Sequence, residues 1–93
     1  MKSNASWMAL DVARWMLAEL DREGMLSQEE AVSEIGDRFG EEFTPPNENG
    51  NLSIRTDVLA AFRKLTDETV VWERGERLWR KRERHDNPGR QQN

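Results

Sequence analysis

The side chains that most often carry enzyme chemistry are scarce in this chain. There is no cysteine and a single histidine, His85, and neither a GxGxxG nor a GxxxxGK[ST] phosphate-binding motif occurs. A serine nucleophile needs a base beside it, and one histidine in a polar C-terminal stretch is a poor source of that base. Ser27 is better explained as the cap of a helix. The sequence therefore predicts that the protein is not an enzyme.

The spacing of oxygen ligands does not favour a metal site. Asn47, Asn49 and Asn51 match the odd spacing of the first EF-hand ligands, but Gly50 falls at the fourth position of such a loop and Val58 at the twelfth. An EF-hand needs glycine at the sixth position and glutamate at the twelfth. Asn49-Gly50 is more typical of a turn. We expect no metal ion and no cofactor.

Basic side chains gather in the C-terminal half of the chain. Residues 1–50 carry eleven acids and four bases, a net charge of −7, whereas residues 51–93 carry seven acids and ten bases, a net charge of +3. Either acidic helices pair with basic strands, or the basic half is a docking surface. Because Lys and Arg neutralise phosphates, the candidate nucleic-acid contacts are Arg63, Lys64, Arg74, Arg77, Arg80 and Arg82.

Two observations oppose nucleic-acid binding. Glu73, Glu76 and Glu83 are interleaved with these bases, and the whole chain has a net charge of −4. Charged residues on an edge strand also prevent edge-to-edge aggregation, which is a purely structural use of the same pattern. Nucleic-acid binding is therefore the alternative hypothesis.

The first predicted helix, Trp7 to Glu23, offers a different surface. Its polar positions form one narrow stripe, at Asp11, Arg14, Asp21 and Arg22. The remaining apolar surface is wider than the ~100° of an ordinary surface helix, so the helix is either central to the fold or gives one flank to a partner. Because a small domain rarely buries a helix on nearly all sides, we expect a homodimer formed through Trp7, Met8, Val12 and Trp15.

Local signals predict the other helices. Gly24 and Gly40 are expected to end the first two helices, and Ser27 with Glu30 is expected to form a capping box at the start of the second. A loop with Pro45-Pro46 follows, then a short strand near 51–54 and a third helix over roughly 56–65.

A two-residue period over residues 69–82 predicts a β-hairpin around Gly75-Glu76. The favoured register places Trp72 opposite Trp79, whereas a three-residue turn would pair Val71 with Trp79.

We predict one compact domain over residues 7–84, with flexible tails at 1–6 and 85–93. Its fold class is α+β, with three helices and a small antiparallel sheet ending in the hairpin. This pattern is winged-helix-like, although a winged helix has its first strand between helices one and two.

Three stretches of the chain resemble a family of small bacterial proteins associated with the mobile gene cassettes of integrons. They are NENGNLSI (47–54), VLAAFRKLT (58–66) and TVVWERGERLWR (69–80), and the tail Pro88-Gly89-Arg90-Gln91-Gln92 extends the resemblance. The family has no assigned activity, so the resemblance supplies no site residues. It implies a bacterial protein in the cytoplasm.

The sequence thus predicts a small non-enzymatic protein-binding or adaptor module that self-associates through its first helix. The alternative is a winged-helix-like DNA-binding or transcription-accessory protein that uses the third helix and the C-terminal hairpin. No apolar run approaches the ~18 residues of a membrane span, and the N-terminus lacks the apolar core of a signal peptide. We expect no membrane partner.

Overall fold

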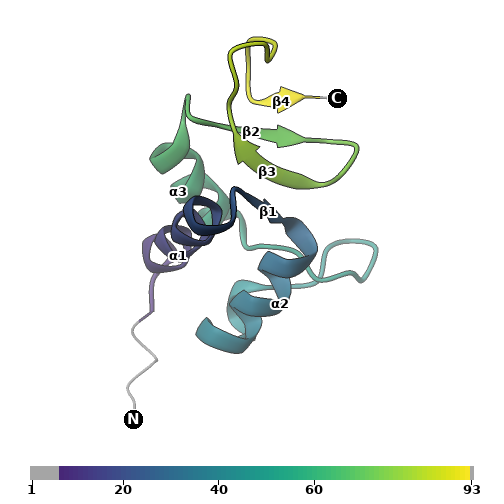
Figure 1. The fold of residues 1–93 in the computed structure, drawn as a ribbon. Helices are drawn as coiled ribbons and strands as arrows, with labels where there is room; N and C mark the ends of the chain where they lie inside the picture. Colours follow the sequence, from purple (N-terminus) through teal and green to yellow (C-terminus); the bar gives the residue numbers. More distant parts are fainter. Residues whose placement is uncertain (1–6, 93) are drawn as a thin grey trace.

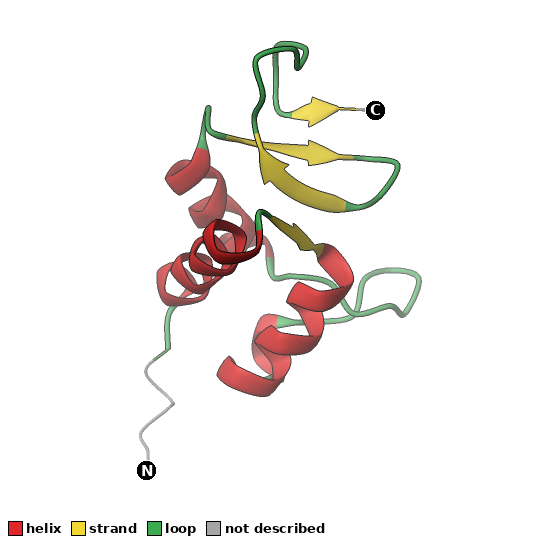
Figure 2. Cartoon of the chain, viewed as in Figure 1, coloured by secondary structure: helices red, strands yellow, loops and turns green. Residues whose placement is uncertain are grey.

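The structure, a computed structural model, describes residues 7–92. Three α-helices and four strands give an α+β fold, as the sequence predicts (Figure 2). The elements follow in the order α1 (Ala9–Glu23), β1 (Met25–Ser27), α2 (Gln28–Phe39), a 3₁₀ helix η2 (Glu41–Phe43), α3 (Thr56–Thr66), β2 (Val70–Glu73), β3 (Leu78–Lys81) and β4 (Gln91–Gln92).

The sheet has the strand order β1-β3-β2-β4, and helices α1 and α3 lie on one side of it (Figure 1). Strand β3 pairs antiparallel with both β1 and β2, whereas β4 runs parallel to β2. The sheet is therefore mixed, and the prediction of a purely antiparallel sheet is wrong at the β2–β4 edge.

The hairpin has the favoured register, with Trp72 opposite Trp79. The two indole rings lie 4.7 Å apart between centroids. The turn differs from the prediction, because the four residues Arg74–Arg77 connect the last pair of the ladder and the Arg77 N–H donates to the Glu73 carbonyl at 2.8 Å. Arg77, and not Gly75, adopts the left-handed conformation, with φ of 56°.

The first strand is not where the sequence suggested. The expected strand at 51–54 is wrong, since Leu52 forms only an isolated bridge with Pro46 and is 57% exposed. The first strand is β1, between α1 and α2, where Leu26 pairs with Trp79 and is buried. Burial of Leu26 against the sheet stabilises a strand that has only three residues.

Two of the predicted helix ends are confirmed in their local geometry. Gly24 ends α1 with φ of 86° and donates its N–H to the Leu20 carbonyl at 2.7 Å, as expected for a glycine just past a helix. The Ser27 hydroxyl accepts from the Glu30 N–H at 3.1 Å and so caps α2. The Glu30 carboxylate accepts from the Ser27 hydroxyl, at 3.5 Å, and not from the Ser27 N–H, so only the hydroxyl half of the predicted capping box is formed.

Helix α1 lies at the centre of the core. Four of its side chains are fully buried, at Val12, Ala13, Met16 and Leu20. Trp15 and Leu17 are half-buried and pack against the same core from the two flanks. The unusually wide apolar surface of this helix is therefore largely used within the monomer.

The C-terminal stretch departs from the expected flexible tail at 85–93. Residues 85–92 fold back along the sheet, and β4 pairs with β2. Arg80 faces away from the helices, and its guanidinium forms ion pairs with Glu73 and Asp86, both at 2.7 Å. These pairs hold the tail against the outer face of the sheet. The predicted tail at 1–6 and Asn93 lie outside the described residues.

Candidate interaction surfaces

Three large apolar side chains remain exposed at the start of α1. Trp7 is 39% exposed, Met8 68% and Leu10 42%. The Trp7 ring meets the edge of Phe39, at the end of α2, with 4.9 Å between ring centroids. Since large apolar groups are normally scattered singly on a monomer, this cluster is a candidate binding surface.

The structure divides the predicted dimer residues between core and surface. Val12 is fully buried and is a core residue. Trp15 packs edge-on against Phe39 at 6.2 Å and beneath the Arg38 guanidinium at 5.4 Å, so its ring is already engaged within the monomer. Trp7 and Met8 remain at the surface. Leu10 joins them at the surface.

The solvent side of α1 also carries an ordered set of small and charged residues. Asp11, Arg14 and Ala18 follow one another at spacings of three and four, which places them on one face of α1, and Trp7 precedes the helix at the same end as Asp11. Arg14 and Ala18 are exposed, and Asp11 is half-buried with its Oδ2 accepting the Met8 N–H at 2.8 Å. This face is the solvent stripe of α1.

The candidate nucleic-acid residues do not converge on one surface. Arg63 and Lys64 are exposed in the last turns of α3, which ends beside the start of β2 (Figure 1). The hairpin turn lies at the other end of β2, where Arg77 accepts the Gln28 N–H through its carbonyl at 2.9 Å. Four residues of strand separate the two groups by about 10 Å or more.

Two other arginines of this set have structural partners. Arg80 donates to Glu73 and Asp86, and Arg82 donates to the backbone carbonyls of Glu68, Asn87 and Gly89. Both side chains therefore fasten the tail to the sheet. Of the six predicted contacts, the side chains of Arg63, Lys64 and Arg74 form no hydrogen bond or ion pair with another residue of the described chain.

The electrostatics around Arg80 are strongly perturbed. Hydrogen bonds from the Arg80 guanidinium hold the pKa of Asp86 well below its ordinary value, and the Glu83 N–H adds to this effect. Asp86 and Glu73 together raise the pKa of Arg80. The mutual shifts mark a structural ion-pair network, because each charge is satisfied by the others.

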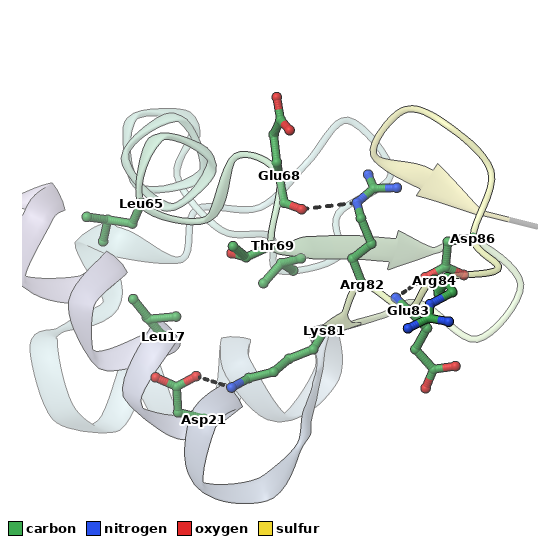
Figure 3. Close-up of a pocket in the computed structure, with 11 residues that line it drawn as sticks. Leu17, Asp21, Leu65, Glu68, Thr69, Lys81, Arg82, Glu83, Arg84 and Asp86 are labelled. Carbon is green, nitrogen blue, oxygen red and sulfur yellow. Dashed lines mark hydrogen bonds and ion pairs between the residues drawn. The ribbon is translucent and has the colours of Figure 1, made fainter.

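A hollow of about 770 Å³ lies between α1, the end of α3 and the residues that follow β3 (Figure 3). Leu17 and Leu65 form its apolar part, and the Lys81–Asp21 ion pair, at 2.9 Å, crosses one side of it. Acids and bases alternate around the rest. The hydroxyl of Thr69 donates to the Thr66 carbonyl, so it is not poised as a nucleophile.

Within residues 7–92, no group of three or more His, Asp or Glu side chains is arranged to hold a metal ion. His85 is 78% exposed at its side chain and lies beside Glu83 at 3.3 Å. In the same part of the chain, no helix has the length and apolar character needed to cross a membrane.

A second basic group is visible only in the structure. Arg63, Arg82 and Arg90 border a hollow of about 390 Å³ beside the end of α3. Sequence reasoning missed Arg90, which stands in the stretch expected to be flexible. The Pro88-Gly89 turn was the available signal that the chain reverses there.

The domain is thus an α+β fold whose candidate sites are binding surfaces on α1 and beside α3. The chain belongs to a family of unknown function (DUF6953), whose model matches residues 8–81. The match runs from the start of α1 to the end of β3, so Asp86, Arg90 and β4 lie outside it. Neither the curated proteins nor the solved structures contain a match to this chain.

Proposed function

We propose that the protein is a small binding module that self-associates through the solvent stripe of α1. The observation that carries the proposal is the exposed cluster of Trp7, Met8 and Leu10 at the start of that stripe. Burial of a large apolar side chain contributes about 1.5–3 kcal/mol. A second copy is the occupant to which this surface is best matched.

The charges on the stripe are complementary to those of a second, antiparallel copy. A two-fold axis brings residue i of one copy against residue j of the other and repeats the contact in reverse. With the axis midway between Asp11 and Arg14, each Asp11 faces Arg14 of the other copy. The same register brings the N-terminal end of α1, which Trp7 precedes, beside Ala18 of the other copy, an exposed small residue beside which a large ring fits.

A charge exchange tests this arrangement. Light scattering should give a dimer for the wild type at micromolar concentrations. Arg14→Asp places two acids opposite each other and should yield a monomer, whereas Asp11→Arg combined with Arg14→Asp should restore the dimer. Arg74→Asp, an equal charge reversal at the hairpin turn, is the matched control and should remain dimeric.

A wild type that stays monomeric over the whole accessible range would contradict the proposal. So would a dimer that Arg14→Asp leaves intact. Because Arg14 is exposed and has no partner among residues 7–92, its substitution separates loss of the interface from loss of the fold.

Winged-helix-like DNA binding is the second candidate, and the order of elements favours it. A strand lies between the first two helices, and the next two strands form a hairpin after the third helix. Against it stand the division of the basic residues and the net charge of −4. In a duplex titration we expect binding no tighter than about 10⁻⁴–10⁻⁶ M, the range of non-specific contacts.

A tighter complex with duplex DNA would favour DNA binding over self-association as the function. Its affinity should then fall with log salt at a slope of about −0.9 per phosphate contacted, and Arg63→Ala with Lys64→Ala should reduce that slope.

The association with integron gene cassettes and a cytoplasmic location complete the proposal. They are supported by the resemblance of residues 47–54, 58–66 and 69–80 to the bacterial family described above.

A further inference from the structure

The hollow beside the end of α3 is bordered by three arginines from three segments. Arg63 comes from α3, Arg82 from the residue after β3, and Arg90 from the tail. Its volume of about 390 Å³ exceeds that of a phosphate ion and leaves space for a small group attached to it. Asp67, Glu68, Pro88 and Gly89 complete the border.

Two of the guanidinium groups are held in place by neutral partners. Arg82 donates to the carbonyls of Glu68, Asn87 and Gly89, which uses three of its five N–H groups. Arg90 donates to the Thr66 hydroxyl at 3.1 Å and to the Val70 carbonyl at 3.4 Å. Each keeps further N–H donors, and each is already ordered before any ligand arrives.

The positive charge of the three arginines is not neutralised by direct pairing. No carboxylate in residues 7–92 forms an ion pair with Arg63, Arg82 or Arg90. Glu68 meets Arg82 through its backbone carbonyl, and its carboxylate points away from that guanidinium (Figure 3). Burial lowers the pKa of Arg90, and the neighbouring charges of Arg63 and Arg82 lower it further, whereas Asp67 opposes them.

The tail is shaped so that it brings Arg90 to this place. Gly89 has φ of 93°, a conformation that glycine adopts without strain, and its carbonyl accepts from Arg82. The chain then reverses, and Arg90 lies over the Phe62 ring at 5.7 Å. Gly89 thus binds Arg82 through its carbonyl and is followed directly by Arg90, so the turn positions both arginines.

We infer that the hollow bordered by Arg63, Arg82 and Arg90 is a binding site for the phosphoryl group of a small phosphomonoester. Arginine presents a planar set of donors that matches phosphate oxygens in pairs. A monoester carries a charge near −2, which three converging cations attract more strongly than the single charge of a backbone phosphodiester. This site is separate from the solvent stripe of α1 and does not depend on self-association.

A titration followed by NMR tests the site. Inorganic phosphate and O-phosphoserine are added at constant ionic strength, with chloride as the balancing anion. We expect saturable shifts of the side-chain N–H signals of Arg63, Arg82 and Arg90 and of the Gly89 amide. Dimethyl phosphate, a phosphodiester, and acetate should bind at least about tenfold more weakly, since each loses charged hydrogen bonds that the monoester forms.

Variants assign the effect to these residues. Arg63→Gln, an exposed position, should weaken phosphate binding about tenfold, and Arg74→Gln at the hairpin turn should leave it unchanged. Arg90→Lys keeps the charge but loses the planar donors, and it should also weaken binding. Shifts that grow linearly with phosphate, or an affinity that Arg63→Gln does not alter, would overturn the inference. Equal affinity for dimethyl phosphate would overturn the preference for a monoester.

Discussion

Arg80 links three segments of the chain through one guanidinium group. It lies on β3, forms an ion pair with Glu73 on β2, and donates to both carboxylate oxygens of Asp86 in the tail, at 2.7 and 2.9 Å. The Asp86 side chain is only 4% exposed, so this pair is better shielded from solvent than the other ion pairs of the described chain. At the residue scale, it is the contact that organises the outer face of the sheet.

The pair makes stability depend on pH. The pKa of Asp86 is lower in the folded state than its unfolded value of about 3.9. The contribution of ionised Asp86 to the free energy of unfolding is therefore present above about pH 4 and is lost as the pH falls through the folded pKa. The free energy of unfolding of Asp86→Asn should be lower than that of the wild type at pH 7, and the difference should shrink progressively below pH 4.

Chemical denaturation at a series of pH values measures this difference. Asp37→Asn, an exposed acid on α2 without an ion pair among residues 7–92, is the matched control. A difference between wild type and Asp86→Asn that is constant from pH 7 to pH 2 would show that the pair contributes nothing through its charge.

The hairpin turn carries a second residue-scale prediction. Arg77 has φ of 56°, and a residue with a Cβ pays roughly 1–2 kcal/mol there. Its side chain offers only an exposed contact to Gln28 at 3.3 Å in return. Arg77→Gly should therefore raise the free energy of unfolding by about 1 kcal/mol. Thermal melting measures this change in stability. Arg74→Gly, at a position without positive φ, is the control and should lower the free energy of unfolding.

At the scale of elements, β4 is the least expected part of the fold and is held by few residues. Trp72 donates its N–H to the Arg90 carbonyl at 2.7 Å, and Arg74 donates to the Gln92 carbonyl at 2.9 Å. Gln92 is 5% exposed, and its side chain bonds to the backbone of Asn87 in both directions. These contacts predict that the tail contributes to stability.

Deletion of residues 86–93 should lower the free energy of unfolding by about 2 kcal/mol or more. This is the net value of the two backbone hydrogen bonds to β2 together with the Arg80–Asp86 ion pair. For a domain of this size, that is a fall in melting temperature of about 8 °C or more. Gln92→Ala should reproduce part of the loss, whereas Gln91→Ala, at an exposed position, should not. Unchanged melting after the deletion would mean that the tail does not hold the sheet.

The elements that sequence reasoning found and missed differ in how they are stabilised. Helix α3 and the 70–81 hairpin have their own periodicity, and the turns near Gly24 and Asn49-Gly50 are set by backbone preferences of those residues. Strand β1 has three residues and β4 two, which is too short for any period to be read. Both exist because a distant strand offers a free edge.

The candidate sites also divide into parts that local sequence indicates and parts that depend on distant contacts. The exposed start of α1 was partly visible in the sequence, because the apolar surface of the predicted helix, which includes Trp7 and Met8, is wider than a small core can cover. The burial of Val12 was not, since it depends on which face of α1 meets the core. The convergence of Arg63, Arg82 and Arg90 joins residues from three separate segments, so only the tertiary structure reveals it.

At the scale of the whole molecule, the acidic and basic halves of the chain are not cancelled by pairing. Within residues 7–92, Lys81–Asp21 is the ion pair that joins residues 1–50 to residues 51–93, and the remaining pairs lie within one half. The central position of α1 leaves only its solvent stripe for a partner. That stripe is balanced in charge, which favours a second copy over a strongly charged ligand.

The most direct test of the account is an isotope-filtered nuclear Overhauser measurement on a mixture of labelled and unlabelled protein. Ala18 lies nine residues along α1 from the first helical residue, Ala9, a rise of about 13.5 Å at 1.5 Å per residue. Trp7 precedes Ala9, so the two side chains are too far apart for a signal within one chain. The account predicts a cross-peak between the Trp7 ring and the Ala18 methyl group of the other copy, lost in Arg14→Asp. A dimeric sample without that cross-peak would contradict the proposed pairing of α1 with its own copy.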